Sequence, residues 1–247
     1  PRDEYGEESN IVRRLDKTGN VVFLPFDLTV PFARICARSG HMRLKRFDIA
    51  DVYRENLLAG GQPRAVLAAS YDIISQEPDP SAEAEVLALM YELLQMPGLA
   101  GEAWNVELSH ESILRVFLQR FPAQFHSALL EALPQYLARG SDARVRHLLG
   151  SAGMPVSLLD EVDAWNIYED FYKALHTLAQ LLTPEERTKL AEPLAHLVSV
   201  VRLAREFSVQ SKIYLVPLFS HSHTHYRNGP MMSVSKMSSR AKHLDDL

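Results

Sequence analysis

The sequence predicts an α+β fold in which a β-rich core is interrupted by a long helical insertion. Short runs rich in branched and aromatic residues, typical of strands, occur toward both ends of the chain. Between them, residues 111–206 consist of amphipathic stretches with helical spacing, such as SALLEALPQYL and EDFYKALHTLAQLL. Strands that are grouped apart from a block of helices indicate an α+β core rather than alternating strand–helix units.

The first part of the chain predicts a strand and two helices before residue 96. Residues 21–26 (VVFLPF) predict the strand. Four residues that favour a helix start or stop define the helix that follows: Asp27, Thr29, Pro31 and Gly40. Apolar residues at helical spacing are expected to form its buried side: Phe32, Ile35 and Cys36. Residues 81–95 predict a second helix, with acidic residues at its positive end.

A β-hairpin is predicted between these helices. The stretch MRLKRFDIADVYREN alternates apolar and polar residues, which predicts a strand with one buried side. The Gly60-Gly61 pair with Pro63 predicts a turn, and residues 67–74 predict the returning antiparallel strand.

Further strands are predicted at residues 104–109 and 212–218, one on each side of the helical block. That block is expected to break at Pro122, Gly150 and Pro184. The predicted organisation therefore has three segments: core residues 1–110, an insertion over 111–206 and a return to the core over 207–247.

Composition places the chain among ordinary folded proteins. Of its 247 residues, 47% are hydrophobic and 23% are charged. No run approaches the roughly 18 apolar residues that span a bilayer, so no membrane partner is expected. The single cysteine, Cys36, excludes an internal disulfide, and its apolar neighbours favour a core-filling thiol in a reducing, cytoplasmic location. Because the chain starts at Pro1 rather than Met, we expect it to be an excerpt of a longer protein.

The overall net charge of −5 argues against general electrostatic binding of nucleic acid, but one region is basic. Residues 34–64 contain seven basic and three acidic side chains, a local net charge of +4. Such a patch is typical of phosphate binding, and an ordinary solvated face with scattered ion pairs is an equal alternative.

Three groups of residues could carry chemistry, and each also has a simpler explanation. His221, His223 and His225 alternate and would share a strand face, but no neighbouring carboxylate supports a metal site, so a solvated histidine cluster is favoured. No nucleophile motif or glycine-rich phosphate loop is present. Arg54 and Arg64 flank the predicted turn and could hold a phosphate between them. The alternative is that Arg54 pairs with a nearby carboxylate, Asp51 or Glu55.

Several ordered segments resemble histidyl-tRNA synthetase, a class II synthetase. LPFDLTVPFAR, LKRFDIADVYREN, YDII and PSAEAEVLALMYELL follow the order of that family, and the second corresponds to its motif 2. The resemblance covers most of the chain. It implies a class II antiparallel sheet flanked by helices, with a helical insertion.

The departures from the family pattern concern the substrate pocket. Where a working enzyme has a glutamate and a glycine, this chain has Asp27 and Leu28, followed by Thr29. The returning strand of motif 2 lacks the family's polar substrate ligands and has instead Ala65, Leu67 and Ala68. The histidine-specific block is reduced to a segment that ends near Tyr226, without the arginine that assists adenylate formation. The resemblance therefore implies a degenerate pocket without catalytic residues. No cofactor and no metal are expected.

Within this family the chain is most similar to the synthetase-like domains of starvation-responsive kinases of translation initiation factor 2α, of the general control, fungal-like type. LPFDLTVPFAR, the short GGQPR turn and KIYLVPLFSHSHTHYRNG carry this likeness. It implies an inactive regulatory domain that senses uncharged tRNA, forms a homodimer and controls an adjacent kinase domain. The expected tRNA-binding residues are Tyr53, Arg54 and Arg64, with Lys45 and Arg46 as backbone-phosphate contacts.

Three other functions stay open from the sequence. The chain could be an active histidyl-tRNA synthetase that tolerates these replacements. It could be a regulatory subunit of ATP phosphoribosyltransferase in histidine biosynthesis, although so large a helical insertion disfavours this. It could also be a dimerisation scaffold without tRNA binding, which the negative net charge allows.

Overall fold

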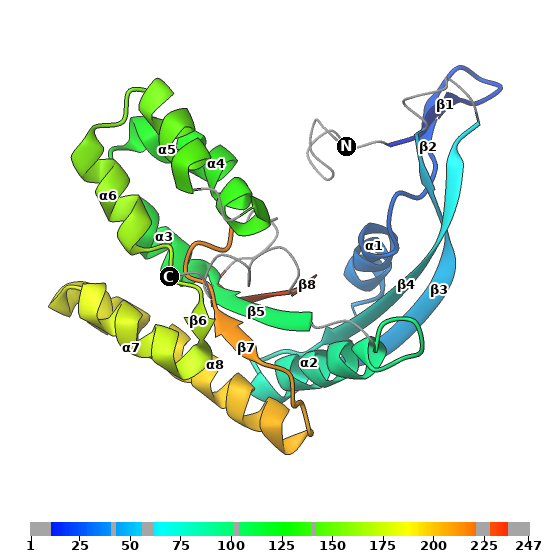
Figure 1. Cartoon of the computed structure of the whole chain (residues 1–247). Coiled ribbons are helices and arrows are strands. Elements are labelled where there is room, and N and C mark those ends of the chain that lie inside the picture. The colour runs from blue at the N-terminus through cyan, green and yellow to red at the C-terminus, as the bar shows by residue number, and fades with distance from the viewer. Residues whose placement is uncertain are drawn as a thin grey trace. The chain divides into compact units, whose positions relative to one another are not determined.

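A computed structural model describes residues 11–40, 43–55, 62–100, 104–139, 142–220 and 228–236 (Figure 1). The chain divides into two compact units, residues 1–79 and 80–247. We refer to them as unit 1 and unit 2 and describe each by itself.

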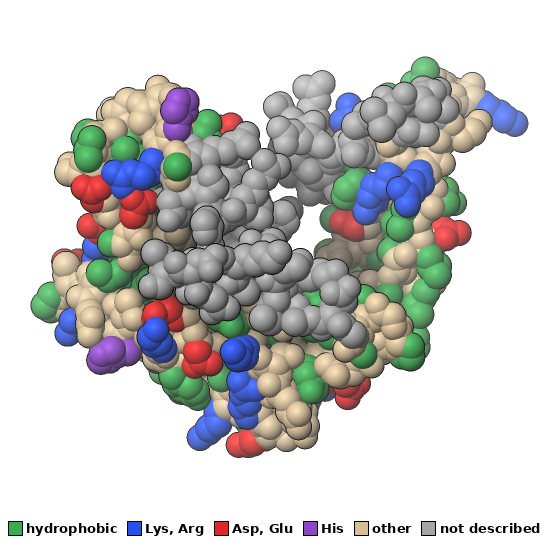
Figure 2. Space-filling model, in the orientation of Figure 1, with side chains coloured by type: hydrophobic (Ala, Val, Ile, Leu, Met, Phe, Trp, Pro, Cys, Tyr) green, Lys and Arg blue, Asp and Glu red, His purple; other side chains and the backbone are tan. Residues whose placement is uncertain are grey.

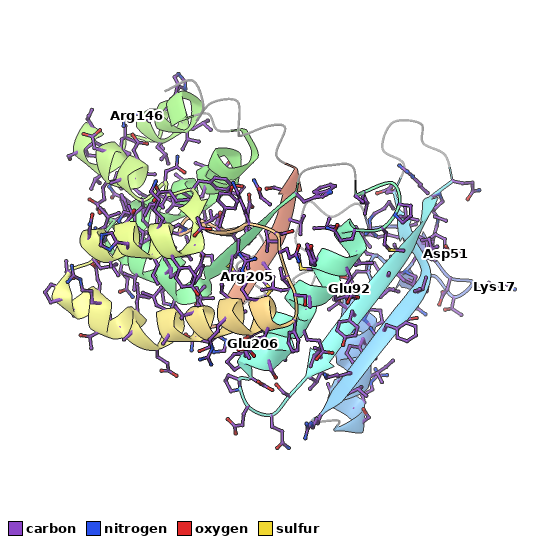
Figure 3. All side chains as sticks on the ribbon, turned by 60° about the horizontal axis from the view of Figure 1, so that its bottom comes forward. Lys17, Asp51, Glu92, Arg146, Arg205 and Glu206 are labelled. Atoms are coloured by element: carbon purple, nitrogen blue, oxygen red, sulfur yellow. The ribbon has the colours of Figure 1, made fainter. Side chains whose placement is uncertain are left out.

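The described residues of unit 1 form two antiparallel strand pairs and one helix. Its elements are β1 (Arg13–Leu15), β2 (Val21–Phe23), α1 (Thr29–Ser39), β3 (Leu44–Arg54) and β4 (Arg64–Ile74). Asp16 closes the β1–β2 turn by accepting hydrogen bonds from the backbone nitrogens of Thr18 and Asn20, at 2.8 and 2.9 Å. Lys17 projects from this turn and Asp51 from β3 (Figure 3).

Helix α1 begins and ends where the sequence predicts, but its buried side is narrower than expected. Gly40 terminates it with φ +66°, a left-handed conformation that glycine adopts without strain. Phe32 is buried, whereas Ile35 is 59% exposed and the thiol of Cys36 is only partly covered. The prediction of Cys36 as core filling is therefore wrong, because α1 packs through Phe32.

The long hairpin of β3 and β4 positions most of the predicted site. The two strands pair over their full length, from Leu44 opposite Ile74 to Arg54 opposite Arg64. β4 starts at Arg64, three residues earlier than predicted, because Arg64 to Val66 also pair with β3.

Because successive strand residues point to opposite sides, the hairpin has two distinct faces. We call one the arginine face, formed by Leu44, Arg46, Asp48, Ala50, Val52, Arg54, Arg64, Val66, Ala68, Ser70, Asp72 and Ile74. We call the other the apolar face, formed by Lys45, Phe47, Ile49, Asp51, Tyr53, Ala65, Leu67, Ala69, Tyr71 and Ile73. Along β3 the arginine face is the less exposed of the two. As predicted, β3 has one covered side. That side is the arginine face, which is the more polar of the two.

Unit 2 contains the predicted helical block and a four-stranded sheet. Its elements are α2 (Pro80–Leu94), β5 (Trp104–His110), α3 (Glu111–Gln119), η1 (Ala123–Phe125), α4 (His126–Arg139), α5 (Asp142–Ser151), α6 (Val156–Ala164), β6 (Glu169–Asp170), α7 (Phe171–Leu181), α8 (Pro184–Glu206), β7 (Ile213–Leu215) and β8 (Pro230–Lys236). The strand order is β6-β7-β5-β8, with β5 parallel to β7 and antiparallel to β8.

The main apolar core lies in unit 2. Val106 and Leu108 of β5 are fully buried with residues of α2, α3 and α8, and the core continues through the helical block. Helix α8 starts with a capping box at Thr183 and Glu186. It is joined to the segment before β7 by Arg205, whose Nη1 donates to the carbonyls of Val209 and Ser211 at 2.6 and 2.9 Å (Figure 3).

Most predicted boundaries in unit 2 agree with the structure. β5 ends at His110 and α8 ends at Glu206. The division into a core, an insertion over 111–206 and a return to the core stays a prediction. Helix breaks occur at Pro122 and Pro184, but α5 continues through Gly150 to Ser151. β7 is shorter than predicted and covers only residues 213–215. In the described part of the chain, the structure contains no helix with the length and apolarity needed to cross a bilayer.

Candidate nucleic-acid interface and degenerate pocket

The hairpin ends in two arginines that stand directly opposite each other. Arg54, the last residue of β3, pairs in register with Arg64, the first residue of β4. Like charges placed opposite each other destabilise an antiparallel pair. Among the described residues neither guanidinium forms an ion pair, and the alternative contact of Arg54 with Asp51 or Glu55 does not form. An anion held between the two guanidinium groups would remove their repulsion.

Arg54 has a second role, which it shares with Arg46. Each arginine holds the segment around the start of α1 through one carbonyl and one aromatic ring. Arg54 Nη1 donates to the carbonyl of Phe26, and its guanidinium lies 3.6 Å from the centroid of the Phe26 ring. Arg46 Nη2 donates to the carbonyl of Leu28 at 3.0 Å, and its guanidinium lies 3.7 Å from the Phe32 ring centroid. These cation–π contacts explain why α1 covers the arginine face.

Arg46 is also neutralised by carboxylates on the same face. Its Nε lies 3.0 Å from Asp72 Oδ2, and its Nη1 lies 3.2 Å from Asp48 Oδ2. Ser70 Oγ donates to the same Asp72 oxygen at 2.9 Å. A guanidinium between two carboxylates offers little net positive charge to an incoming phosphate. The assignment of Arg46 as a phosphate contact stays a prediction.

Lys45 and Tyr53 lie on the apolar face, opposite to the arginines. The five predicted RNA-binding residues are thus divided between the two sides of the hairpin. Only Arg54, Arg64 and Arg46 share a side, and of these Arg64 is the most exposed. Tyr53 and Arg54 are neighbours in the sequence, but neighbouring residues of a strand point to opposite faces. The separation of the two side chains therefore follows only once the segment is assigned to a strand.

Asp27 serves as a helix-start residue. Its Oδ1 accepts a hydrogen bond from the backbone nitrogen of Val30 at 3.0 Å, which satisfies one of the free N–H groups of the first turn of α1. Thr29 is the first residue of α1 and is exposed. Both residues therefore lie at the entrance of the helix that covers the arginine face.

The three apolar residues predicted to stand in place of substrate ligands, Ala65, Leu67 and Ala68, do not share one side of β4. Ala68 lies on the arginine face, opposite Ala50. Ala65 and Leu67 lie on the apolar face, where Leu67 is 71% exposed. Tyr226 is outside the described residues.

The absence of a metal site stays a prediction. No group of three or more His, Cys, Asp or Glu side chains is close enough there to hold a metal ion. His221, His223 and His225 are outside the described residues.

Sequence reasoning missed a polar row on β5, in unit 2. Asn105, Glu107 and Ser109 alternate along the strand and are buried on one side of the sheet. Glu107 Oε1 accepts hydrogen bonds from the hydroxyls of Tyr168 and Ser235 at 3.1 and 2.8 Å. Asn105 Oδ1 and Ser109 Oγ are buried and have no hydrogen-bond partner among the described residues. The alternation in NVELS is the sequence signal that could have indicated this row.

Comparison with known proteins identifies the family. Residues 3–241 match the family model described as histidyl-tRNA synthetase. The chain belongs to the histidyl-tRNA synthetase family. The predicted class II synthetase-like α+β fold is confirmed by solved structures, among them histidyl-tRNA synthetase from Nostoc sp. PCC 7120. That comparison has a TM-score of 0.73 at 17% identity and covers 95% of this chain and 55% of that one.

Relatives of this synthetase-like chain include both kinases and synthetases. The eIF-2-alpha kinase GCN2 of Schizosaccharomyces pombe is 25% identical over 244 residues, which cover 97% of this chain and 15% of the kinase. The probable cytoplasmic histidine–tRNA ligase of Encephalitozoon cuniculi is 34% identical over 120 residues, covering 47% of this chain and 27% of the ligase. The chain thus spans only a small part of the length of these relatives. The predicted resemblance to a synthetase-like domain of such kinases is confirmed.

Proposed function

We propose that this chain is a regulatory domain that no longer forms histidyl-adenylate. It binds uncharged tRNA, forms a homodimer and controls a protein kinase on the same polypeptide during amino-acid starvation, in the cytoplasm. The match to GCN2 of Schizosaccharomyces pombe over 97% of the chain supports the regulatory role and the kinase neighbour.

The observation that carries the RNA-binding part is the opposed pair Arg54 and Arg64. Two guanidinium groups at the turn end of a hairpin, without a carboxylate partner among the described residues, favour a phosphate between them. Arg54 is oriented by Phe26, and Arg64 completes the pair from the other strand. Arg46 is assigned to positioning α1, because Asp48 and Asp72 already occupy its guanidinium.

The loss of adenylation is supported by the chemistry of the arginine face. Ala50 and Ala68 stand opposite each other in its centre, so neither strand offers a side-chain donor or acceptor at this position. A bound histidine would leave polar atoms unpaired there, at a cost of about 1–3 kcal/mol for each missing partner. Carboxylate activation needs such groups held in place around the reacting atoms.

Arg64→Gln is expected to weaken binding of uncharged tRNA about tenfold. The substitution removes one phosphate contact, so the slope of log affinity against log salt concentration should also fall by about one. Because Arg64 is exposed, its removal leaves the hairpin folded. Filter-binding titrations at several salt concentrations measure both quantities.

Lys189→Gln is the matched control. Lys189 lies on α8, is half exposed and pairs with Glu185 at 2.8 Å, so its loss removes the same charge far from the hairpin in sequence. Equal weakening by both substitutions would mean that net charge, not the arginine pair, governs binding. Unchanged binding by Arg64→Gln would refute the site.

Histidine-dependent ATP–pyrophosphate exchange is expected to stay at the background level. The physical reason is the absence of polar ligands at Ala68 and its partner Ala50. A measurable rate that requires histidine would favour the alternative of an active synthetase, which the ligase relatives keep open. A synthetase of known activity, assayed in parallel, verifies the assay.

A further inference from the structure

The start of α1 is held on the hairpin by two arginine clamps, whose contacts all lie within unit 1. We call Arg54 with Phe26 the near clamp, because Arg54 lies at the turn end of the hairpin. We call Arg46 with Phe32 the far clamp. In each clamp the guanidinium stacks on the ring and donates to a carbonyl at the start of α1, that of Phe26 or Leu28. Figure 2 shows Lys and Arg side chains beside hydrophobic ones on the visible part of this unit.

The turn between the two clamped carbonyls is short and locally fixed. Asp27 alone separates the two residues, and its Oδ1 accepts a hydrogen bond from the backbone nitrogen of Val30 at 3.0 Å. The backbone nitrogen of Tyr53 donates to the carbonyl of Pro25 at 2.8 Å, which holds the chain just before the near clamp. Because both clamps hold the same turn, loosening one of them weakens the contact at the other.

The near clamp and the anion site share one guanidinium group. Both hydrogen bonds that Arg54 forms among the described residues come from Nη1, to the carbonyls of Phe26 and Tyr53. An arginine has five N–H donors, so Nε and Nη2 remain for a phosphate held together with Arg64. The Phe26 ring covers a flat side of the group and leaves this donor edge open. The ring and the phosphate therefore favour the same position of the guanidinium.

We propose that the docking of α1 on the arginine face is coupled to the binding of an RNA phosphate between Arg54 and Arg64. The phosphate removes the repulsion between the two arginines and fixes Arg54 where it also holds Phe26. Docked α1 in turn strengthens phosphate binding, because coupling between two equilibria is reciprocal. The inference rests on the RNA site of the proposed function and adds how that site is regulated.

Amide hydrogen–deuterium exchange of α1 tests the effect of RNA on docking. Saturating uncharged tRNA should slow the exchange of α1 amides in this chain about tenfold, within the usual range of coupling between sites. In Phe32→Leu, which lacks the ring of the far clamp, the slowing should fall below about threefold. Direct shielding of α1 by bound RNA would instead persist in this variant. Mass spectrometry of peptides from residues 29–39 measures the exchange.

The reverse effect, of docking on RNA binding, is tested with the same variant. Phe32→Leu should weaken the binding of uncharged tRNA about tenfold. The slope of log affinity against log salt concentration should not change, because no phosphate contact is lost. Arg46→Lys weakens the far clamp without changing the net charge, since lysine lacks the planar fork that stacks on Phe32. It should act like Phe32→Leu and keeps the test valid if that variant does not fold.

Phe23→Leu is the matched control. The Phe23 ring lies 6.0 Å from the guanidinium carbon of Arg13 on the neighbouring strand and belongs to neither clamp. Its loss should change neither tRNA affinity nor the exchange of α1. Exchange over residues 64–74 verifies that the hairpin stays folded in each variant.

The outcomes separate the coupling from the RNA site itself. Unchanged or faster α1 exchange with tRNA bound would overturn the coupling, and so would unchanged affinity in Phe32→Leu and Arg46→Lys. In either case the RNA site stands if Arg64→Gln still weakens binding and lowers the salt slope. If Arg64→Gln binds tRNA like the unsubstituted chain, the site and the coupling are both refuted.

Discussion

Arg120→Met should lower the free energy of unfolding by about 3–5 kcal/mol. Arg120 follows α3 and joins three other helices. Its Nε and Nη2 donate to Glu186 at 2.8 and 2.6 Å, Nη1 donates to Glu161, and Nη2 also reaches the carbonyl of Leu181 at 2.8 Å. The guanidinium lies 4.8 Å from the ring centroid of Trp165, which is fully buried. Its removal would leave two carboxylates in a largely enclosed site without their cation.

Arg115→Met is the matched control for this prediction. Arg115 lies on α3, is 53% exposed and among the described residues forms an ion pair only with Glu111, one turn away, so its loss should cost less than about 0.5 kcal/mol. Chemical unfolding followed by far-UV circular dichroism measures the change, because unit 2 holds most of the helices. Adding Glu161→Gln and Glu186→Gln to Arg120→Met should restore part of the loss. Equal effects of the two arginine substitutions would show that the network is not structural.

Acidification from pH 7 to pH 5 should destabilise unit 2 by about 2 kcal/mol through His110 alone. Burial, and after it the electrostatic effect of the nearby His196, lowers the pKa of His110 from its ordinary 6.5 to about 4. Arg115 acts in the same direction, and Glu111 opposes the shift. The imidazole is 4% exposed, and its Nδ1 accepts a hydrogen bond from the backbone nitrogen of Ser112 at 3.1 Å at the start of α3. Protonation would remove this acceptor.

The sign follows from proton uptake in the two states. Below pH 6.5 the unfolded chain binds a proton at His110, while the folded chain stays neutral there until about pH 4. Stability is therefore complete above pH 6.5 and falls as the pH decreases toward 4. His110→Asn keeps a helix-capping acceptor that does not titrate, so its stability should vary less over this range. Unfolding curves at pH 7, 6 and 5 for both proteins decide this, and parallel pH profiles would contradict it.

The helices and the hairpin strands of this chain could be predicted because their signals are local. Gly40 ends α1 and Pro184 begins α8 as expected, since these residues restrict or relax the backbone where they stand. The helix break predicted at Gly150 is wrong, because α5 includes Gly150 and ends at Ser151. A glycine inside a helix costs only about 1 kcal/mol, which packing overcomes.

Hydrophobicity does not predict which face of the hairpin is covered. From hydrophobicity alone, Phe47 and Ile49 would be expected to be buried and the arginines to be exposed to solvent. The structure has the opposite arrangement along β3, because Arg46 and Arg54 stack on Phe32 and Phe26 and hold α1 on their side. These contacts join residues that lie 14 and 28 positions apart, so no local pattern contains them.

The sequence by itself determined the family, the order of the elements and the presence of Ala65, Leu67 and Ala68 at the positions where polar substrate ligands are predicted to be missing. These features depend only on which residues occur and in what order. The tertiary structure decided that Tyr53 and Lys45 are separated from Arg54, and that Arg54 stands opposite Arg64. The physical reason is that side chains alternate across a strand, so the pairing register of β3 with β4 sets which groups meet.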